Sequence, residues 1–427
     1  MKTFINPARA EWPEILKRSV FDVSGLYQKV NSILSEIKNT GDKALHEYTK
    51  KFDGVELEQF RVKEDEVAAS EKEVSRELKE AMLLASANIE KFHAPQKPEI
   101  TKIETVPGVT CWQKAVAIEK VGLYIPGGTA PLFSTVLMLA IPARIAGCKE
   151  IVLCTPPGKE GKIHPAILYA AKISGVKNIF KLGGVQAVGA MAYGTETVPK
   201  VHKIFGPGNQ FVTAAKQLVS MSDVSIDMPA GPSEVMVVAD ESANPAFVAS
   251  DLLSQAEHGA DSQVVLLANS EMLVHEINEQ INIQLEKLPR KEMTQKSLAN
   301  SLAIVLKNKQ DTLAMINEYA PEHLILCTED YTELAEKVVN AGSVFLGNFT
   351  PESAGDYASG TNHTLPTNGW AKTYSGVNLD SFMKKITFQE LKPEGLKNIG
   401  PAIEIMAATE QLDAHKNAVS LRLKGLI

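Results

Sequence analysis

Two adjacent residues, Glu322 and His323, pair a carboxylate with an imidazole, and such a pair can accept and release protons near neutral pH. They lie where a predicted helix gives way to a predicted strand. Side chains that bind metals through nitrogen or oxygen stand in other segments of the chain: Gln255, His258, Asp356 and His415. Packing alone does not readily explain such a set. These residue types indicate a metalloenzyme that transfers protons beside a bound cation.

The segment that carries Gln255 and His258 has the pattern of a helix. Asn244 is suited to cap its start, Pro245 to occupy its first position and Gly259 to end it. Gln255 and His258 are three residues apart, so they share one face of the last turn, where the carbonyl dipoles favour a cation. A capping histidine beside a surface glutamine would explain this segment equally well.

The other candidate ligands lie further along the chain. Asp356 and His363 belong to a predicted loop of small residues after the strand at 343–346, and Glu410 and His415 belong to a helix near the C-terminus. Zinc binds histidine nitrogen and carboxylate oxygen, and catalytic zinc keeps a position open for substrate. A glutamine amide is a weak ligand, so we expect a labile metal. Taken alone, each of these segments also fits an ordinary loop or a solvated pair.

Three glycine-rich turns follow predicted strands, at Tyr124–Pro131, Leu182–Gln186 and Phe205–Asn209. Ligands bind at the carboxyl ends of strands in open parallel sheets, and glycine lets the backbone approach a phosphate. Each turn alone fits an ordinary connection, but three in one domain favour a nucleotide site. The fingerprint Gly-x-Gly-x-x-Gly is absent, so a dinucleotide would depend more on side chains. The candidates are Tyr124, Gln186 and Asn209.

Short apolar stretches alternate with helical patterns from Lys120 onward. The first series of predicted strands is Val121–Ile125, Ile151–Cys154, Asn178–Leu182 and His202–Phe205. The second is Glu234–Asp240, Gln263–Ala268, Leu302–Leu306, Leu324–Cys327 and Ser343–Leu346. This alternation predicts parallel sheets, and continuous apolar strands fit burial on both faces. The predicted fold class is α/β, with two Rossmann-like parallel-sheet domains, a helical N-terminal segment and a helical C-terminal tail.

The remaining segments frame these two domains. Roughly the first 95 residues have helical patterns, with one amphipathic helix over Asp65–Phe92, whereas Ile100–Glu119 has the pattern of strands. The predicted limits are 1–23 for the N-terminal segment, 24–118 with 233–380 for a first α/β domain carrying the metal and catalytic residues, 119–232 for a second, nucleotide-binding domain, and 381–427 for the tail. A tail of about 50 residues is too small for its own core, so it must pack on its own chain or on a second subunit.

Composition narrows the class of protein. A chain of 427 residues suggests two or more domains, and 44% hydrophobic with 22% charged residues is average for a soluble protein. The net charge of −7 gives no electrostatic footprint for nucleic acid. No uncharged stretch reaches the roughly 18 residues of a membrane span, and Pro7 interrupts the start, so we expect a cytoplasmic protein.

The cysteines form no Cys-x-x-Cys pair and fit small buried residues better than a zinc or nucleophilic site: Cys111, Cys148, Cys154 and Cys327.

Along essentially its whole length, the sequence resembles the histidinol dehydrogenase family. The most specific stretches are Tyr124-Ile-Pro-Gly-Gly-Thr129, Phe205–Asn209, Asp227–Glu234, Leu253–Gly259, Ala320–His323, Gly355–His363 and Ala414-His415. Members oxidise L-histidinol to L-histidine, the last two oxidations of histidine biosynthesis, with two NAD and through a bound L-histidinaldehyde. This resemblance implies zinc and NAD as cofactors and L-histidinol as the substrate.

The resemblance also implies roles for individual residues. The zinc ligands, one ion per subunit, would be Gln255, His258, Asp356 and His415, and the proton acceptors Glu322 and His323. Substrate would contact Ser233, His363 and Glu410, in addition to His323 and the four metal ligands. NAD would contact Tyr124, Gln186 and Asn209. The family's homodimer, with a tail that crosses to the partner, would place Glu410 and His415 in the partner's active site.

Other functions remain open from the residues alone. A related dehydrogenase that oxidises another primary alcohol to its acid would keep the zinc ligands and Glu322-His323 but change Ser233, His363 and Glu410. A zinc hydrolase would not need the glycine turns, and a non-catalytic binding protein would not need the Glu-His pair.

Overall fold

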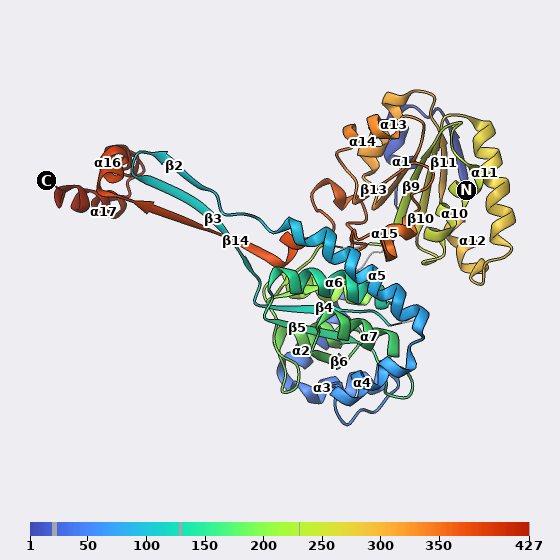
Figure 1. Cartoon of the computed structure of the whole chain (residues 1–427), viewed down its shortest axis with the longest axis horizontal. Helices are drawn as coiled ribbons and strands as arrows, with labels where there is room; N and C mark the ends of the chain where they lie inside the picture. Colours follow the sequence, from blue (N-terminus) through green and yellow to red (C-terminus); the bar gives the residue numbers. More distant parts are fainter. Residues whose placement is uncertain (19–23, 128–129, 230, 427) are drawn as a thin grey trace.

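A six-stranded parallel sheet forms the centre of one lobe, which we call the six-stranded lobe (Figure 1). The structure is a computed structural model that describes residues 1–18, 24–127, 130–229 and 231–426. In sheet order the strands are β1 (Lys2–Ile5), β11 (Leu302–Val305), β10 (Gln263–Ala268), β9 (Glu234–Ala239), β12 (His323–Cys327) and β13 (Ser343–Leu346). Every residue of the four inner strands is buried, which matches their unbroken apolar runs.

Helices cover both faces of this sheet. One face packs against α10 (Pro245–Ala256), α11 (Glu271–Leu285) and α12 (Lys291–Ala299). The other packs against α1 (Trp12–Ile15), α13 (Lys309–Tyr319) and α14 (Tyr331–Lys337). The short helix α15 (Glu352–Tyr357) follows β13 and contacts α10.

A five-stranded parallel sheet forms the second lobe, which we call the five-stranded lobe. Its strands, in sheet order, are β6 (Asn178–Lys181), β5 (Glu150–Thr155), β4 (Lys120–Tyr124), β7 (Lys203–Phe205) and β8 (Ser225–Ile226). On one face lie α6 (Phe133–Ala146) and α7 (Pro165–Ser174), and on the other α8 (Gly184–Tyr193) and α9 (Gln210–Ser220). The two parallel sheets confirm the predicted fold class.

The helices between residues 24 and 93 pack differently from the prediction that joined 24–118 to 233–380. They are α2 (Ser24–Thr40), α3 (Asp42–Tyr48), α4 (Glu64–Glu73) and α5 (Arg76–His93). All four cover the five-stranded lobe: α2 lies on α8 and α9, α3 on α8, α4 on α7 and α5 on α6. An amphipathic pattern shows which side of a helix is buried, but not which sheet buries it.

Two further segments differ from the sequence-based expectation. The N-terminal segment begins with a strand, since β1 pairs with β11 about 300 residues away along the chain and joins the six-stranded sheet. The single helix expected over Asp65–Phe92 is two helices, because Ser75 caps a new start by accepting a hydrogen bond from the Leu78 N–H. Positions 19–23, 128–129, 230 and 427 lie outside the described residues, including the end of the predicted N-terminal segment and part of the first glycine turn.

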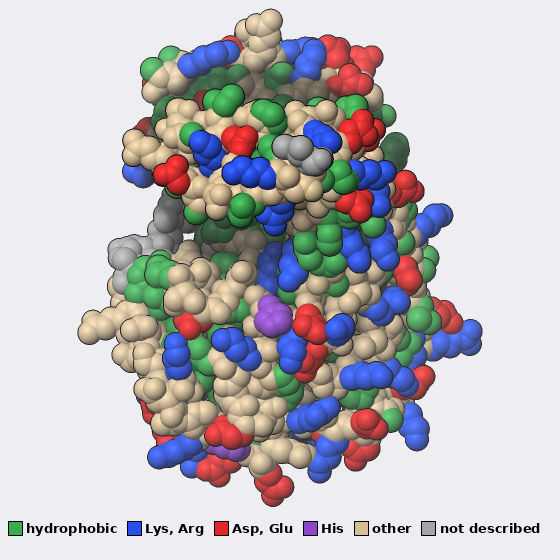
Figure 2. All heavy atoms as spheres, turned by 90° about the vertical axis from the view of Figure 1, so that its left-hand side faces the viewer, with side chains coloured by type: hydrophobic (Ala, Val, Ile, Leu, Met, Phe, Trp, Pro, Cys, Tyr) green, Lys and Arg blue, Asp and Glu red, His purple; other side chains and the backbone are tan. Residues whose placement is uncertain are grey.

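An antiparallel arm projects from the lobes, includes the first part of the predicted tail as a strand and carries the two C-terminal helices at its tip (Figure 1). It consists of β2 (Lys102–Val106), β3 (Val109–Ala117) and β14 (Met383–Leu391), followed by α16 (Pro393–Thr409) and α17 (Asp413–Lys424), which pack on each other. Seen from the side on which the arm projects, the surface carries a mixture of hydrophobic and charged side chains (Figure 2). Large apolar side chains are exposed on α16, on α17 and between them: Ile405, Met406, Leu412 and Leu421.

Two smaller expectations concern membranes and thiols. Within the described residues, none of the helices combines the length and apolar character that a bilayer crossing needs. All four cysteines are free; Cys154 and Cys327 are buried as predicted, whereas Cys111 and Cys148 are only half-buried.

Candidate active site

The Glu322-His323 pair is held by the backbone at the start of β9. Strand β12 is parallel to β9, with His323 opposite Val235. The Glu234 N–H donates to Glu322 Oε2 at 2.9 Å, and His323 Nδ1 lies 3.2 Å from the Glu234 carbonyl oxygen. A carbonyl can only accept, so Nδ1 carries the proton and Nε2 is left as the basic nitrogen. Nε2 is buried and makes no hydrogen bond to the described residues, so in the neutral imidazole it is the nitrogen that can take a proton from a ligand.

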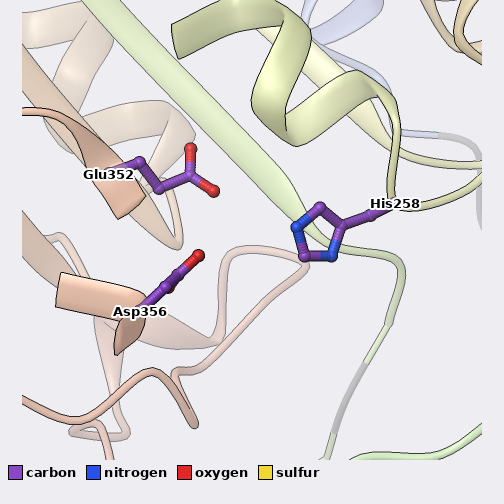
Figure 3. Close-up of side chains that lie close together, drawn as sticks. All are labelled: His258, Glu352 and Asp356. Carbon is purple, nitrogen blue, oxygen red and sulfur yellow. The ribbon is translucent and has the colours of Figure 1, made fainter. Parts of the chain in front are cut away.

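A second cluster adjoins this pair and has the donor atoms of a metal site. His258, Glu352 and Asp356 each offer a ligand atom, and these atoms all lie within 4.8 Å of one another. Figure 3 shows the three side chains directed toward a common space. Glu352 and Asp356 are four residues apart on α15 and therefore share one face of the helix. His323 Nε2 lies 3.7 Å from Asp356 Oδ1, which joins the cluster to the Glu-His pair.

The helix predicted to carry Gln255 and His258 is α10. Asn244 caps its start by accepting from the Ala246 N–H, as predicted. The helix ends at Ala256, so Gln255 lies in its last turn and His258 two residues beyond its end. Gln255 is fully buried, yet neither its amide oxygen nor its amide nitrogen has a hydrogen-bond partner among the described residues. An orphaned buried amide is costly, so this side chain needs a partner that the polypeptide does not supply.

The electrostatics of the cluster also fit a cation. Burial raises the pKa of Glu322 and that of Glu352 to about 8. Burial by itself would lower the pKa of His323, but the carboxyl groups of Glu352, Glu322 and Asp356 raise it to about 10. Buried charge of one sign is stable only when it is paired or binds a metal. A divalent cation among these nitrogen and oxygen donors would balance the acidic groups and remove the field that keeps His323 protonated.

His363 connects the three candidate metal donors to the five-stranded lobe. Its Nδ1 lies 2.9 Å from the Asp356 carbonyl oxygen, and its Nε2 lies 3.1 Å from Thr135 Oγ1 on α6. Ser233 is half-buried and directly precedes β9, so it stands beside the backbone that holds the Glu-His pair. The structure thus brings Ser233 and His363 to the edges of the region formed by Glu322, His323 and the metal cluster.

The predicted cofactor residues gather in a separate cleft of about 1390 Å³ in the five-stranded lobe, lined in part by Tyr124, Gln186 and Asn209. The Tyr124 hydroxyl accepts from the Gly184 N–H at 3.1 Å, and Asn209 caps α9 by accepting from two backbone N–H groups. The walls of the cleft come from the segments at and after the carboxyl ends of β4, β5, β6 and β7, where parallel sheets bind ligands, and from residues of α2 and α4. Pro131, just before α6, also lines the cleft, and α6 carries the Thr135 that contacts His363.

The third glycine turn is fixed by a buried ion pair. Lys216 donates to Asp227 Oδ1 and, at 2.8 Å, to the Gly206 carbonyl oxygen, while the Gly206 N–H donates to Asp227 Oδ2 at 2.8 Å. Gly206 has a φ of +119°, and a Cβ there would lie 2.0 Å from the Tyr124 carbonyl oxygen. Only glycine can take this position, and the ion pair keeps the turn that leads to Asn209 in place.

We predict a large loss of stability for Lys216→Met. The Lys216 and Asp227 side chains are only 5% and 2% exposed, so removing the amine leaves a buried carboxylate unpaired. The expected cost is about 3–5 kcal/mol in the free energy of unfolding, measured by urea titration with a signal that reports the unfolding of the five-stranded lobe. The matched control is Lys38→Met, which breaks the Lys38–Asp223 pair whose lysine is 57% exposed and should cost about 0–1 kcal/mol. Equal losses in the two variants would contradict the assigned role of burial.

Two predicted site residues lie far from the others within one chain. Glu410 directly follows α16 and His415 is on α17; both are exposed, and Figure 1 shows these helices at the tip of the arm, away from α10 and α15. A single chain therefore brings His258 and Asp356 together but leaves His415 outside their cluster. This separation is the arrangement expected if the tail serves a second subunit.

Sequence reasoning missed two residues at these sites. Glu352 is one of the three candidate metal donors, and its spacing of four from Asp356 would have revealed it had a helix been predicted over 352–357 instead of a loop. Asp53 lines the same cleft of the five-stranded lobe and accepts from Gln186 Nε2 at 3.0 Å, and burial raises the pKa of its carboxyl to about 6. Asp53 is far from every glycine turn in sequence, so no local pattern pointed to it.

Comparison with known proteins gives a consistent result. The sequence model of a family described as histidinol dehydrogenase matches residues 16–423. A histidinol dehydrogenase from Bacteroides thetaiotaomicron is 64% identical and covers 100% of both chains, and one from Escherichia coli O157:H7 is 52% identical over 97% of this chain and 95% of the relative. The crystal structure of histidinol dehydrogenase from Elizabethkingia anophelis is 58% identical, with a TM-score of 0.98 over 100% of this chain and 98% of that one. On these matches, the chain belongs to the histidinol dehydrogenase family.

Proposed function

We propose that the chain oxidises L-histidinol to L-histidine in two steps, through a bound L-histidinaldehyde, with one zinc ion per subunit and two NAD per turnover. The reaction consumes one alcohol, one water and two NAD and releases the acid, two NADH and protons. The observation that carries the proposal is a buried Glu-His pair whose free imidazole nitrogen faces a cluster of metal-type donors, in a member of this family. We assign the metal and catalytic residues to the six-stranded lobe and NAD to the five-stranded lobe.

The donor set fits zinc. In our proposal, Gln255, His258 and Asp356 of one chain bind the ion together with His415 of a second chain. The orphaned amide of Gln255 and the excess of buried carboxyl groups support this assignment. When bound, zinc would position a substrate through its imidazole and amine nitrogens and stabilise negative charge on the substrate oxygen.

The Glu-His pair supplies the proton transfers. His323 Nε2 accepts the hydroxyl proton in the first oxidation, because the bond from Nδ1 to the Glu234 carbonyl keeps Nε2 basic. Glu322 then takes a proton from the water that adds to the aldehyde, and the hydrate is the species oxidised in the second step. Ser233, His363 and Glu410 are proposed to contact the substrate and retain the reactive aldehyde.

The cleft of the five-stranded lobe is the proposed NAD site, with Tyr124, Gln186 and Asn209 as contacts. NAD would accept the hydride in each oxidation, and the strand ends and helix starts around the cleft suit its phosphates. We further propose that the reaction takes place in the cytoplasm, as the last step of histidine biosynthesis. A relative that oxidises another primary alcohol to its acid is the alternative function.

We also propose a homodimer with shared active sites. The tail would cross to the partner, so that Glu410 and His415 act in the other subunit's site. Two observations support this: the metal cluster of one chain lacks His415, and the tail exposes Ile405, Met406 and Leu421. Exposed apolar residues gathered on two helices that pack on each other are typical of a surface that another chain covers.

Product stoichiometry tests the proposed function. Each L-histidinol consumed should give two NADH and one histidine with little free aldehyde, measured by NADH absorbance and amino-acid analysis of the same sample. Removing metal with a chelator should abolish turnover, and added zinc should restore it. One NADH per substrate with released aldehyde would rule out the four-electron reaction. Turnover of other primary alcohols but not of histidinol would favour the alternative.

A further inference from the structure

A buried ion pair lies behind the Glu-His pair, on the opposite face of the six-stranded sheet. The Arg18 guanidinium donates to both carboxylate oxygens of Glu234, at 2.5 Å from Nε and 3.0 Å from Nη2. The Glu234 side chain is 3% exposed and that of Arg18 is 16% exposed. Side chains alternate along a strand, so the Glu234 carboxylate points away from the face that carries His323 and toward the core formed by Trp12 and Tyr319.

The same guanidinium also holds the end of α13. Arg18 Nη2 donates to the Tyr319 carbonyl oxygen at 2.6 Å, and the guanidinium carbon lies 3.8 Å from the centre of the Tyr319 ring. The Tyr319 hydroxyl in turn donates to Gln263 Oε1 at 2.9 Å. We call Arg18, Glu234, Tyr319 and Gln263 the rear clamp. It ties the start of β9 to the chain that leads from α13 into Glu322 and His323.

The clamp contacts the backbone on which the active side chains depend. The Glu234 N–H holds Glu322 Oε2, and the Glu234 carbonyl oxygen faces His323 Nδ1. Ala320, between Tyr319 and this pair, has a φ of +52°, which is an unfavourable conformation for a residue other than glycine. Such a conformation persists only when its surroundings fix it, and the clamp fixes the residue on its N-terminal side.

We propose that Arg18 is a positioning residue for the oxidation: by anchoring Glu234, it holds the peptide groups that orient Glu322 and keep the His323 proton on Nδ1. This inference rests on the proposed function, in which His323 Nε2 is the base. Without Arg18, the Glu234 carboxylate loses its partner, the start of β9 shifts, and His323 is free to adopt its other tautomer. A misplacement of about 1 Å can cost about 10²-fold in rate.

The test uses Arg18→Gln and Arg18→Lys in the full-length, zinc-loaded enzyme. Arg18→Gln should lower kcat by about 10²-fold with KM for histidinol and zinc content near those of wild type, and Arg18→Lys should recover part of the loss. Arg9→Gln is the matched control, because Arg9 lies in the same N-terminal segment and pairs with Asp311 through a side chain that is 64% exposed. It should leave kcat unchanged.

A double variant separates positioning from stability. Arg18→Met with Glu234→Met removes both buried charges, and such replacements are often neutral or stabilising. This double variant should fold, and its urea midpoint of unfolding should be near that of wild type. Its kcat should nevertheless stay as low as that of Arg18→Gln. If it recovers the wild-type kcat, the clamp is only a structural element and the proposal is overturned.

The histidine tautomer gives a readout that does not depend on turnover. In zinc-loaded, ¹⁵N-histidine-labelled enzyme, the signals of His323, assigned by their loss in His323→Asn, should report a single Nδ1–H form in wild type and a mixture in Arg18→Gln. An unchanged tautomer in Arg18→Gln would overturn the proposal even if activity fell. Failure of the wild-type enzyme to oxidise histidinol would instead count against the proposed function and leave this measurement decisive for Arg18.

Discussion

Glu322→Gln should slow the oxidation of L-histidinaldehyde by about 10²–10⁴-fold, while the oxidation of L-histidinol to the aldehyde changes far less. Only the second oxidation needs water to be deprotonated, and an amide cannot accept that proton. The substitution keeps the shape of the side chain, and the Glu234 N–H can still donate to an amide oxygen where it now donates to Glu322 Oε2. His323→Asn should instead impair both oxidations, because each releases a proton from oxygen.

Single-turnover experiments separate the two steps, with either the alcohol or the aldehyde supplied to enzyme in excess over substrate. Glu318→Gln is the matched control, since it removes an exposed carboxylate of α13 only four residues earlier in the chain. It should leave both rates unchanged. Equal losses of the two rates in Glu322→Gln would remove the water-activating role assigned to this carboxylate.

Mixed dimers of two inactive variants, His258→Asn and His415→Asn, should regain activity. If the tail crosses to the partner, one site of each mixed dimer carries both lesions and the other carries neither. Each mixed dimer should then have one intact site and half the activity of a wild-type dimer, whereas either parent variant alone has almost no activity. This is the outcome expected for two equivalent sites related by a twofold axis, each built from both chains.

The mixing experiment needs proof that subunits exchange. A mass tag on one variant shows the mixed species directly, and each variant mixed with itself gives the background. If mixed dimers form but remain inactive, every site still contains one lesion. His415 would then act on its own chain, and the shared site proposed above would be wrong.

Much of the site could be predicted because it rests on residue types and local patterns. The pair Glu322-His323 and the donors His258 and Asp356 have chemistry that packing seldom requires, and the structure brings them together. The alternation of apolar strands with helices was sufficient for the α/β class. The roles assigned to these four side chains in catalysis and in metal binding remain predictions for the experiments above.

What sequence reasoning missed depends on contacts between distant segments. Nothing in the helical pattern of α2 says that it packs on α8, and the four residues of β1 show their role only through β11. Strand β14 was assigned to a helical tail because most of its residues are exposed and no buried stripe marks it as a strand. Glu352 and Arg18 were missed since their function depends on what they face after folding.

The position of the tail also has a consequence for the working concentration of the enzyme. If each site needs a tail from another chain, the number of working sites follows mass action in the protein itself. Specific activity should then fall on dilution below the dissociation constant of the pair, even with zinc, NAD and substrate saturating. A newly made chain would also be inactive until it binds a second one. The rate of product formation would therefore rise more steeply than the concentration of the polypeptide.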